Sequence, residues 1–209
     1  MRIRNLLIIA LTVVAATTAG ALARNQLKTH RAEFKAYTIT WQITDYDESG
    51  AVSNQYTETR YTARDGRWYS VRQFSDGHRQ ETFCLPGEGV FIRGKDQLIF
   101  LSEAPKGPPV TVAEEKVRKS PSFLRSEEVH GLKAFVSKSG PGGREEVYRA
   151  LGLNNDWIKR VGRRENGNLK STVEPISIEM GDPDPSVFEG IDLPVDRSFY
   201  EQKQGMRKR

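Results

Sequence analysis

Polar and apolar residues alternate with a period of two along much of the stretch from residue 34 to residue 101. The most regular part is 37–44, where threonines and a glutamine separate Tyr37, Ile39, Trp41 and Ile43. Residues two apart in a strand point to the same face, so this pattern predicts one apolar and one polar face. Short glycine-containing turns such as 47–50 and 64–66 separate six stretches of this kind. The sequence therefore predicts an antiparallel meander.

The strand pattern stops at residue 102 and returns at residue 132. Prolines 105, 108 and 109 exclude regular structure at the start of this interval. Residues 112–118 are expected to form one or two helical turns, and residues 122–130 are expected to form a second short helix. Strands then follow as far as residue 180, with Asn166-Gly167 as a hairpin signal. We expect a mainly β fold of about ten strands with short helices, in one domain over 24–200. A basic disordered tail is expected over 201–209.

The first 23 residues have the three parts of a secretory signal. Arg2 and Arg4 are followed by the apolar run 6–14 and by small residues that end at Ala23. Because the run extends to 18 residues when it is counted on to Ala23, an uncleaved membrane anchor is the alternative. The rest of the chain is expected to be periplasmic or secreted, or else anchored and facing the periplasm. Contact with a membrane is expected only through this segment, if it is uncleaved.

Net charge does not indicate nucleic-acid binding. The 209 residues include 32 Lys and Arg against 27 Asp and Glu, a formal net charge of +5. Arg2, Arg4 and the terminal run 207–209 account for this excess, so no basic face for nucleic acid is predicted. The single cysteine, Cys84, has no partner for an internal disulfide, and we expect it to be inert.

Motifs for catalysis and for cofactor binding are absent from the sequence. It has no Gly-x-Ser-x-Gly, no phosphate-binding loop and no dinucleotide fingerprint. Asp182 and Asp184 are separated and followed by prolines, a pattern typical of a rigid turn in which aspartates bond nearby amides. The three histidines lie far apart in polar surroundings. We therefore predict a protein that is not an enzyme and that has no cofactor and no metal.

The second half of the chain resembles a known group of envelope proteins. The segments that carry the likeness are Gly131–Val136, Glu145–Tyr148 and Ile176–Phe188, the last of which contains Asp-Pro-Ser-Val-Phe. They resemble the closing half of the bacterial outer-membrane lipoprotein carriers, the LolA/LolB-like half-barrel superfamily. The resemblance implies an incomplete, strongly curved antiparallel barrel covered by short helices. It also implies an apolar cavity that accepts acyl chains.

Large apolar side chains are the candidate ligand-binding residues. The predicted set is Tyr37, Ile39, Trp41, Ile43, Trp68, Phe91 and Phe100. If covering helices leave this face partly open, it lines a cavity for an apolar or lipid-like ligand, a lipoprotein acyl chain or a segment of an envelope protein. If they cover it fully, the protein is an envelope scaffold with a filled core and no ligand cavity. The first function is the leading hypothesis and the second is the alternative.

Overall fold

Twelve strands form one sheet in the computed structural model, which describes residues 34–104 and 112–207. The first six strands are β1 (Tyr37–Tyr46), β2 (Val52–Thr62), β3 (Trp68–Phe74), β4 (Arg79–Leu85), β5 (Gly89–Arg93) and β6 (Leu98–Ser102). The others are β7 (Phe123–Val129), β8 (Leu132–Ser139), β9 (Glu145–Ala150), β10 (Asp156–Arg163), β11 (Leu169–Met180) and β12 (Val195–Asp196). The helices are α2 (Glu114–Arg118) and α3 (Ser198–Arg207), with short 3-10 turns η1 (Pro141–Gly143), η2 (Leu151–Leu153) and η3 (Pro185–Phe188).

Strand order shows two meanders joined through their long strands. The order across the sheet is β12-β6-β5-β4-β3-β2-β1-β11-β10-β9-β8-β7. Neighbouring strands are antiparallel throughout except for β12, which runs parallel to β6. The edge strands β12 and β7 do not pair with each other, so the sheet is open. The predicted fold class is confirmed, and the strands that the sequence did not predict are β7 and β12.

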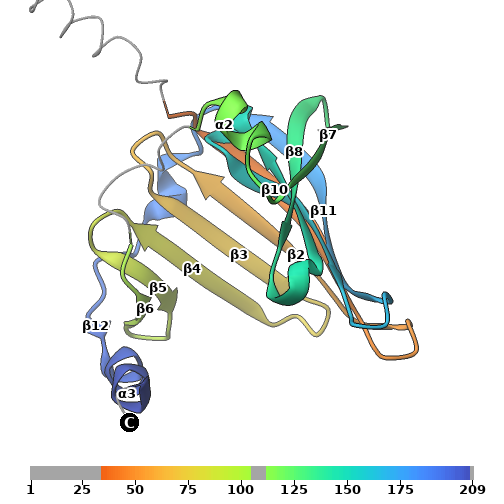
Figure 1. Cartoon of the computed structure of the whole chain (residues 1–209). Helices are drawn as coiled ribbons and strands as arrows, with labels where there is room; N and C mark the ends of the chain where they lie inside the picture. The colour runs from red at the N-terminus through yellow and green to blue at the C-terminus, as the bar shows by residue number, and fades with distance from the viewer. Residues whose placement is uncertain (1–33, 105–111, 208–209) are drawn as a thin grey trace, which may run out of the picture. The chain divides into compact units, whose positions relative to one another are not determined.

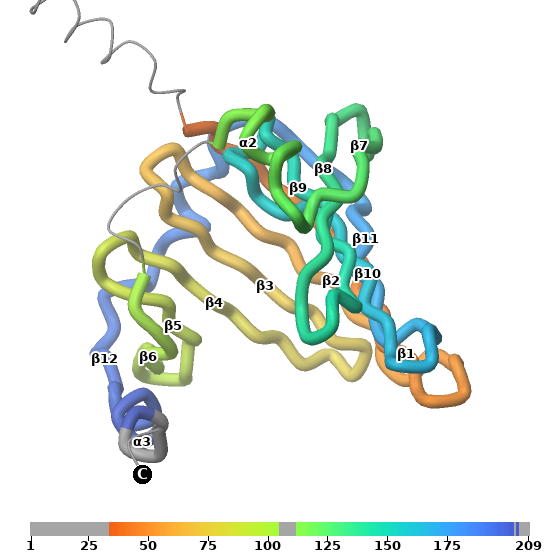
Figure 2. The backbone as a smooth tube through the Cα atoms, viewed as in Figure 1, coloured from red at the N-terminus to blue at the C-terminus, as the bar shows by residue number. Residues whose placement is uncertain are grey.

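The sheet is strongly curved. In Figure 1, β8 crosses in front of β2 at the right, while β3 and β4 turn an open face to the viewer. The tube in Figure 2 shows that the chain passes behind β2–β4 after β11, on its way to β12 and α3. We call the face whose Trp41 packs with residues of β8, β9 and β10 the concave face, and the opposite face, on which Phe188 packs, the outer face.

Two sequence predictions about local structure differ from the observed fold. The predicted helix over 122–130 is wrong, because β7 occupies Phe123–Val129 and pairs with β8 along its length. The expected disordered tail from residue 201 is instead largely the helix α3. This helix is stabilised at its start, where Asp196 Oδ1 accepts a hydrogen bond from the Ser198 amide at 2.9 Å, and where Tyr200 packs on Phe100.

One part of the connection between the two halves of the sheet agrees with the sequence. The helical turns expected over 112–118 are confirmed as α2.

The predicted signal or anchor segment 1–23 lies outside the described residues. Within the described residues, no helix has the length and apolar character needed to cross a membrane.

Candidate ligand-binding face

Strand register assigns each side chain of β1–β6 to one of the two faces. Paired residues in neighbouring strands share a face, so they form rows across the sheet. Two concave-face rows are Tyr37-Thr62-Trp68-Cys84-Val90 and Ile39-Arg60-Ser70-Thr82-Ile92-Ile99. One outer-face row is Thr38-Tyr61-Tyr69-Phe83-Phe91-Phe100. The predicted site residues are therefore divided, with five on the concave face and Phe91 and Phe100 on the outer face.

On the outer face, Phe91 and Phe100 belong to a filled core. Their rings meet edge to face with centroids 5.5 Å apart, and both side chains are at most 3% exposed. The C-terminal segment covers this core, with Phe188 buried in it and other apolar residues packed around it, namely Val187, Ile191, Leu193 and Tyr200. This position leaves Phe91 and Phe100 without access to a ligand on the concave face.

The β1 end of the concave face is also filled. Tyr37, Ile39, Trp41 and Ile43 are between 0% and 6% exposed and form one cluster with buried residues of β8, β9 and β10. Of the two alternatives that the sequence left open, this part of the sheet has the filled core. These four side chains support the concave face and have almost no free surface of their own.

The β3–β6 end of the concave face is different. Trp68, Val90, Ile92 and Ile99 are each partly exposed, and Cys84 lies buried between Trp68 and Val90 in the first row. We call these five residues the apolar strip. The opposite side of the same strands is covered by the C-terminal segment, so β5 and β6 are apolar on both faces, and among the described residues that segment packs on the outer face only. The apolar strip is thus a partly exposed apolar part of the concave face as far as the described residues show.

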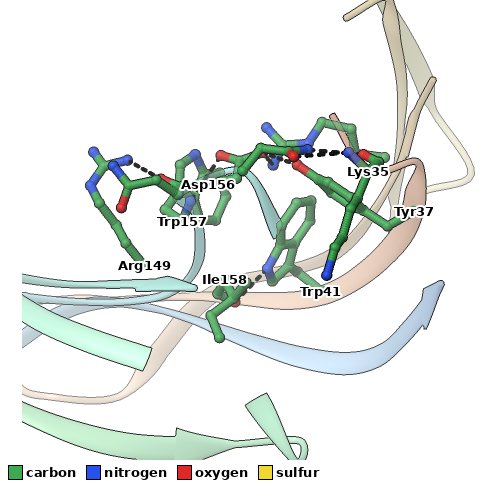
Figure 3. A network of polar contacts seen from close by, with 10 residues as sticks. Lys35, Tyr37, Trp41, Arg149, Asp156, Trp157 and Ile158 are labelled. Carbon is green, nitrogen blue, oxygen red and sulfur yellow. Dashed lines mark hydrogen bonds and ion pairs between the residues drawn. The ribbon is translucent and has the colours of Figure 1, made fainter. Parts of the chain in front are cut away.

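A partly buried polar network lies next to the apolar strip, between β1, β2 and β10. Asp156 Oδ2 accepts a hydrogen bond from the Tyr37 hydroxyl at 2.6 Å and an ion-paired hydrogen bond from Arg60 Nη2 at 2.5 Å. Figure 3 shows Asp156 beside Tyr37, with Trp41 and Trp157 close by. The Arg60 side chain is only 11% exposed, so its charge depends on Asp156 for compensation.

Two tryptophans hold this network in place. Trp41 and Trp157 stack with ring centroids 4.6 Å apart, and the Arg60 guanidinium lies over both rings. The Trp41 indole N–H donates to the Ile158 carbonyl at 2.7 Å, as Figure 3 shows. Sequence reasoning did not find Arg60, Asp156 or Trp157. No local sequence pattern links these residues, because Arg60 and Asp156 are 96 positions apart and meet only in the folded chain.

Burial shifts the ionisation of two concave-face groups. Burial, followed by the nearby Asp156 charge, raises the pKa of the Tyr37 hydroxyl well above its ordinary value of 10.0. Burial also raises the pKa of the Cys84 thiol from 9.0 to about 11. At neutral pH the Cys84 thiol is therefore protonated, and a protonated thiol is a poor nucleophile.

The aspartates after β11 form a structural turn. Asp184 Oδ1 accepts a hydrogen bond from the Ser186 amide at 2.9 Å, and Asp182 forms an ion pair with Arg64 at 3.0 Å. The rigid turn predicted from the sequence is confirmed at Asp184. No group of three or more His, Cys, Asp or Glu side chains is arranged to hold a metal ion within residues 34–104 and 112–207.

A hollow of about 530 Å³ on the outer face has a different character. It lies between β2–β5 and the segment around η3, and Arg79, Glu81 and Arg93 contribute to its lining. Glu81 forms ion pairs with Arg79 at 3.1 Å and with Arg93 at 3.2 Å. Charged walls disfavour a hydrocarbon ligand, so an apolar ligand fits the apolar strip better than this hollow.

Comparisons with known proteins support the fold. The sequence matches no known family and no curated protein. An uncharacterised protein from Thermus thermophilus is similar over 84% of this chain and 98% of its own, at 12% identity and a TM-score of 0.50. A chain in the Pseudomonas aeruginosa MucA/MucB complex is similar at 18% identity over 78% of this chain and 59% of its own, with a TM-score of 0.47. A LolA superfamily protein from Nitrosomonas europaea is similar at 11% identity over 76% of this chain and 91% of its own, with a TM-score of 0.37.

These likenesses are loose. The resemblance to the LolA-like half-barrel proteins is confirmed as a loose match among the similar solved structures. This chain spans 56% to 60% of the length of the MucB chains that it matches. At these identities the comparisons concern the fold alone and say nothing of an activity.

Proposed function

We propose that this is an exported, non-catalytic protein that binds an apolar or lipid-like ligand on the concave face of its sheet. The observation that carries the proposal is the apolar strip. Trp68, Val90, Ile92 and Ile99 retain free surface although their strands already have a complete core on the other side. Apolar surface removed from water contributes about 25 cal/mol per Å², so an acyl chain or an apolar protein segment would bind here favourably.

The predicted ligand-binding set is revised in this proposal. Trp68 is retained because it is partly exposed on the concave face. Val90, Ile92 and Ile99 are added because the register puts them on the same face, two or three strands further on. Tyr37, Ile39, Trp41 and Ile43 are proposed to support the binding face from beneath, whereas Phe91 and Phe100 belong to the outer core.

Export is supported by the sequence of residues 1–23 and agrees with the chemistry of the cysteine. A thiol that is 5% exposed and protonated at neutral pH is protected from oxidation in an oxidising compartment. The same protonated state supports a non-catalytic role for Cys84. We propose the periplasm or the exterior as the site of action, with a lipid, an acyl chain or an envelope protein as the partner.

Titration with an apolar fluorescent probe tests the concave face directly. Ile92→Ser and Ile99→Ser should each weaken probe binding by about 10-fold, because each removes an apolar contact worth about 1–2 kcal/mol. Ile176→Ser is the matched control, since Ile176 is 52% exposed on β11. It should leave probe affinity unchanged. Equal effects of all three substitutions would place the binding surface elsewhere.

Native mass spectrometry of the full chain, purified from an envelope fraction, addresses the natural ligand. Co-purified lipid that is lost in Ile92→Ser, but not in Ile176→Ser, would support the lipid-binding function. The alternative, a scaffold with a filled core, is favoured by the complete burial of Trp41 and Ile39. Absence of both probe binding and co-purified lipid from the wild-type protein would decide for that alternative.

A further inference from the structure

A small pocket lies where the turn between β8 and β9 approaches the β10–β11 hairpin. Its volume is about 320 Å³, and residues of η1, β9, β10, β11 and the hairpin turn line it. We call it the basic pocket, because four cations and two anions contribute to its lining and give a net formal charge of +2. The charged residues are Arg144, Arg163, Arg164 and Lys170, with Glu145 and Glu165.

Both carboxylates of the basic pocket are already engaged by arginines. Glu165 Oε1 forms an ion pair with Arg144 Nη2 at 2.8 Å. Glu145 Oε2 forms an ion pair at 2.8 Å with Nη2 of Arg160, which does not line the pocket. Neither carboxylate therefore compensates the three remaining cations of the lining.

Those three cations have no anionic partner among the described residues. Arg163 Nη1 donates a hydrogen bond to the Gly167 carbonyl at 3.2 Å, and Arg164 Nη2 donates to the Tyr46 carbonyl at 2.5 Å. Within residues 34–104 and 112–207, Arg163, Arg164 and Lys170 form no ion pair with a carboxylate. The Arg164 Nε is buried and has no hydrogen-bond partner, which is unusual for a buried donor. The basic pocket thus has an excess of positive charge and of hydrogen-bond donors.

A β-bulge brings Lys170 to the basic pocket. In the pairing of β10 with β11, Gly162 is opposite Ser171 and Arg163 is opposite Leu169, so Lys170 is an extra residue without an opposite partner. Bulges change the direction of a side chain relative to a regular strand and are frequent beside functional sites. Here the bulge residue is an exposed lysine that lines the same pocket as Arg163.

A glycine within a strand leaves space in the basic pocket. The row Ser171-Gly162-Glu145 shares one face of the sheet, and both Gly162 and Glu145 line the pocket. A Cβ added at Gly162 would lie 3.0 Å from Ser171 Oγ, so a side chain here would crowd this face. Glycine is disfavoured inside strands and often marks a place where a ligand approaches the backbone closely.

We propose that the basic pocket binds the phosphate group of a phosphate monoester. Such a group carries about −1.5 to −2 charges at neutral pH and has three acceptor oxygens, which match the net charge of +2 and the unpaired cations. Arginine guanidinium groups bind phosphate through charge-assisted hydrogen bonds. The residues come from separate strands and a turn, so no phosphate-binding loop is needed in the sequence. The site is independent of the apolar strip and goes beyond the proposed function.

Calorimetric titration of the full chain with glycerol phosphate at low ionic strength tests the site. Succinate, a dianion without phosphate, is titrated for comparison. The test variant combines Arg163→Gln with Lys170→Gln. The matched control combines Lys95→Gln with Lys116→Gln, which removes two exposed charges from the β5–β6 turn and from α2. The test and control variants have the same net charge.

Wild type should bind glycerol phosphate more tightly than succinate. The test variant should bind it at least about 10-fold more weakly, whereas the control should stay within about twofold of wild type. Gly162→Ala leaves the charge unchanged and should weaken binding because it narrows the pocket. The proposal is overturned if wild type does not bind glycerol phosphate, or if the control loses as much affinity as the test variant. Equal binding of succinate would also overturn it and would favour an acidic protein segment as the ligand.

Vesicles of phosphatidylcholine with and without phosphatidic acid identify the source of the phosphate. If phosphatidic acid increases flotation of wild type but not of the test variant, the ligand is a lipid phosphate. If the two proteins float equally while only wild type binds glycerol phosphate, the ligand is a soluble monoester. Binding of the apolar probe on the concave face should be the same in wild type and in the test variant, so failure of this proposal is separate from failure of the proposed function.

Discussion

Trp41→Ala separates a filled core from a lined cavity at the β1 end of the concave face. Trp41 is 0% exposed and stacks on Trp157 at 4.6 Å. Its indole N–H donates to the Ile158 carbonyl, and the Arg60 guanidinium lies 4.9 Å from its ring centroid. Truncation to alanine removes all of these contacts together.

The magnitude follows from these contacts. Loss of a fully buried tryptophan side chain costs about 3–5 kcal/mol of unfolding free energy. The Ile158 carbonyl loses its donor, and an unsatisfied buried group adds about 1–3 kcal/mol. Since a domain of this size has about 5–15 kcal/mol in total, we expect a loss of about 5 kcal/mol, near the limit of folding. Trp41→Phe keeps an aromatic ring and should lose about half of that amount.

Urea denaturation, followed by circular dichroism, measures the loss for each variant. Trp68→Ala is the matched control, since Trp68 is partly exposed on the concave face and should cost about 1–2 kcal/mol. Titration with the apolar probe is run in parallel on every variant that folds. Trp68→Ala should weaken probe binding, and Trp41→Phe should leave the probe affinity within about twofold of wild type.

One pattern of results would refute this account. If Trp41→Ala costs less than about 1 kcal/mol and abolishes probe binding, then Trp41 has free surface and lines an open cavity. The binding face would then have to extend from the apolar strip to β1. A collapse of stability in Trp41→Ala together with normal probe binding in Trp41→Phe supports the filled core.

Three further predictions concern other parts of the molecule. Asp156→Asn should destabilise the fold by about 3 kcal/mol in urea denaturation, because it leaves the Arg60 charge buried without its ion pair, and an unchanged midpoint would contradict this. Folding raises the pKa of Cys84 from 9.0 to about 11, so the protonated thiol contributes stability that is complete below about pH 9 and is lost as the pH rises through about 11. Over that range the unfolding free energy of wild type should fall by up to about 3 kcal/mol more than that of Cys84→Ala. Parallel pH profiles would disprove this. Deletion of residues 2–23 should leave the product in the cytoplasm when the cells are fractionated, and its recovery from the periplasm would exclude the export prediction.

The strands of the first half could be predicted because their two faces differ. On β1 the threonines at 38, 40 and 44 alternate with large apolar residues, and this contrast gives both the period and the buried side. The same reasoning failed over 122–130. There Arg125, Glu127 and Val129 share one side of β7, a period of two that mixes apolar and charged residues and so gives no clear buried face. A register shift between Phe123 and Arg125 interrupts even this period. Pairing with β8, which the local sequence does not show, determines the strand.

The assignment of faces on β5 and β6 could not be made from the sequence. Residues 90–92 and 98–101 are all apolar, so hydrophobicity does not distinguish Phe91 from Ile92 or Phe100 from Ile99. The register with β4 decides, because Phe91 pairs with Phe83 of the outer core. The polar network was equally hidden, since Arg60 and Asp156 meet only when β2 and β10 are brought together across the sheet.

The C-terminal segment covers the outer face of the sheet, and the apolar strip lies on the other face. Residues 187–200 return to cover the outer face of β3–β6, which explains why Phe83, Phe91 and Phe100 are apolar. That explanation does not extend to Ile92 and Ile99, which point the other way and remain partly exposed. Polar residues would suit a solvated face, as the partly exposed threonines at 38 and 40 on the outer side of β1 show. Apolar residues on the concave side lower solubility without completing the core, and the proposed binding of an apolar ligand would account for them.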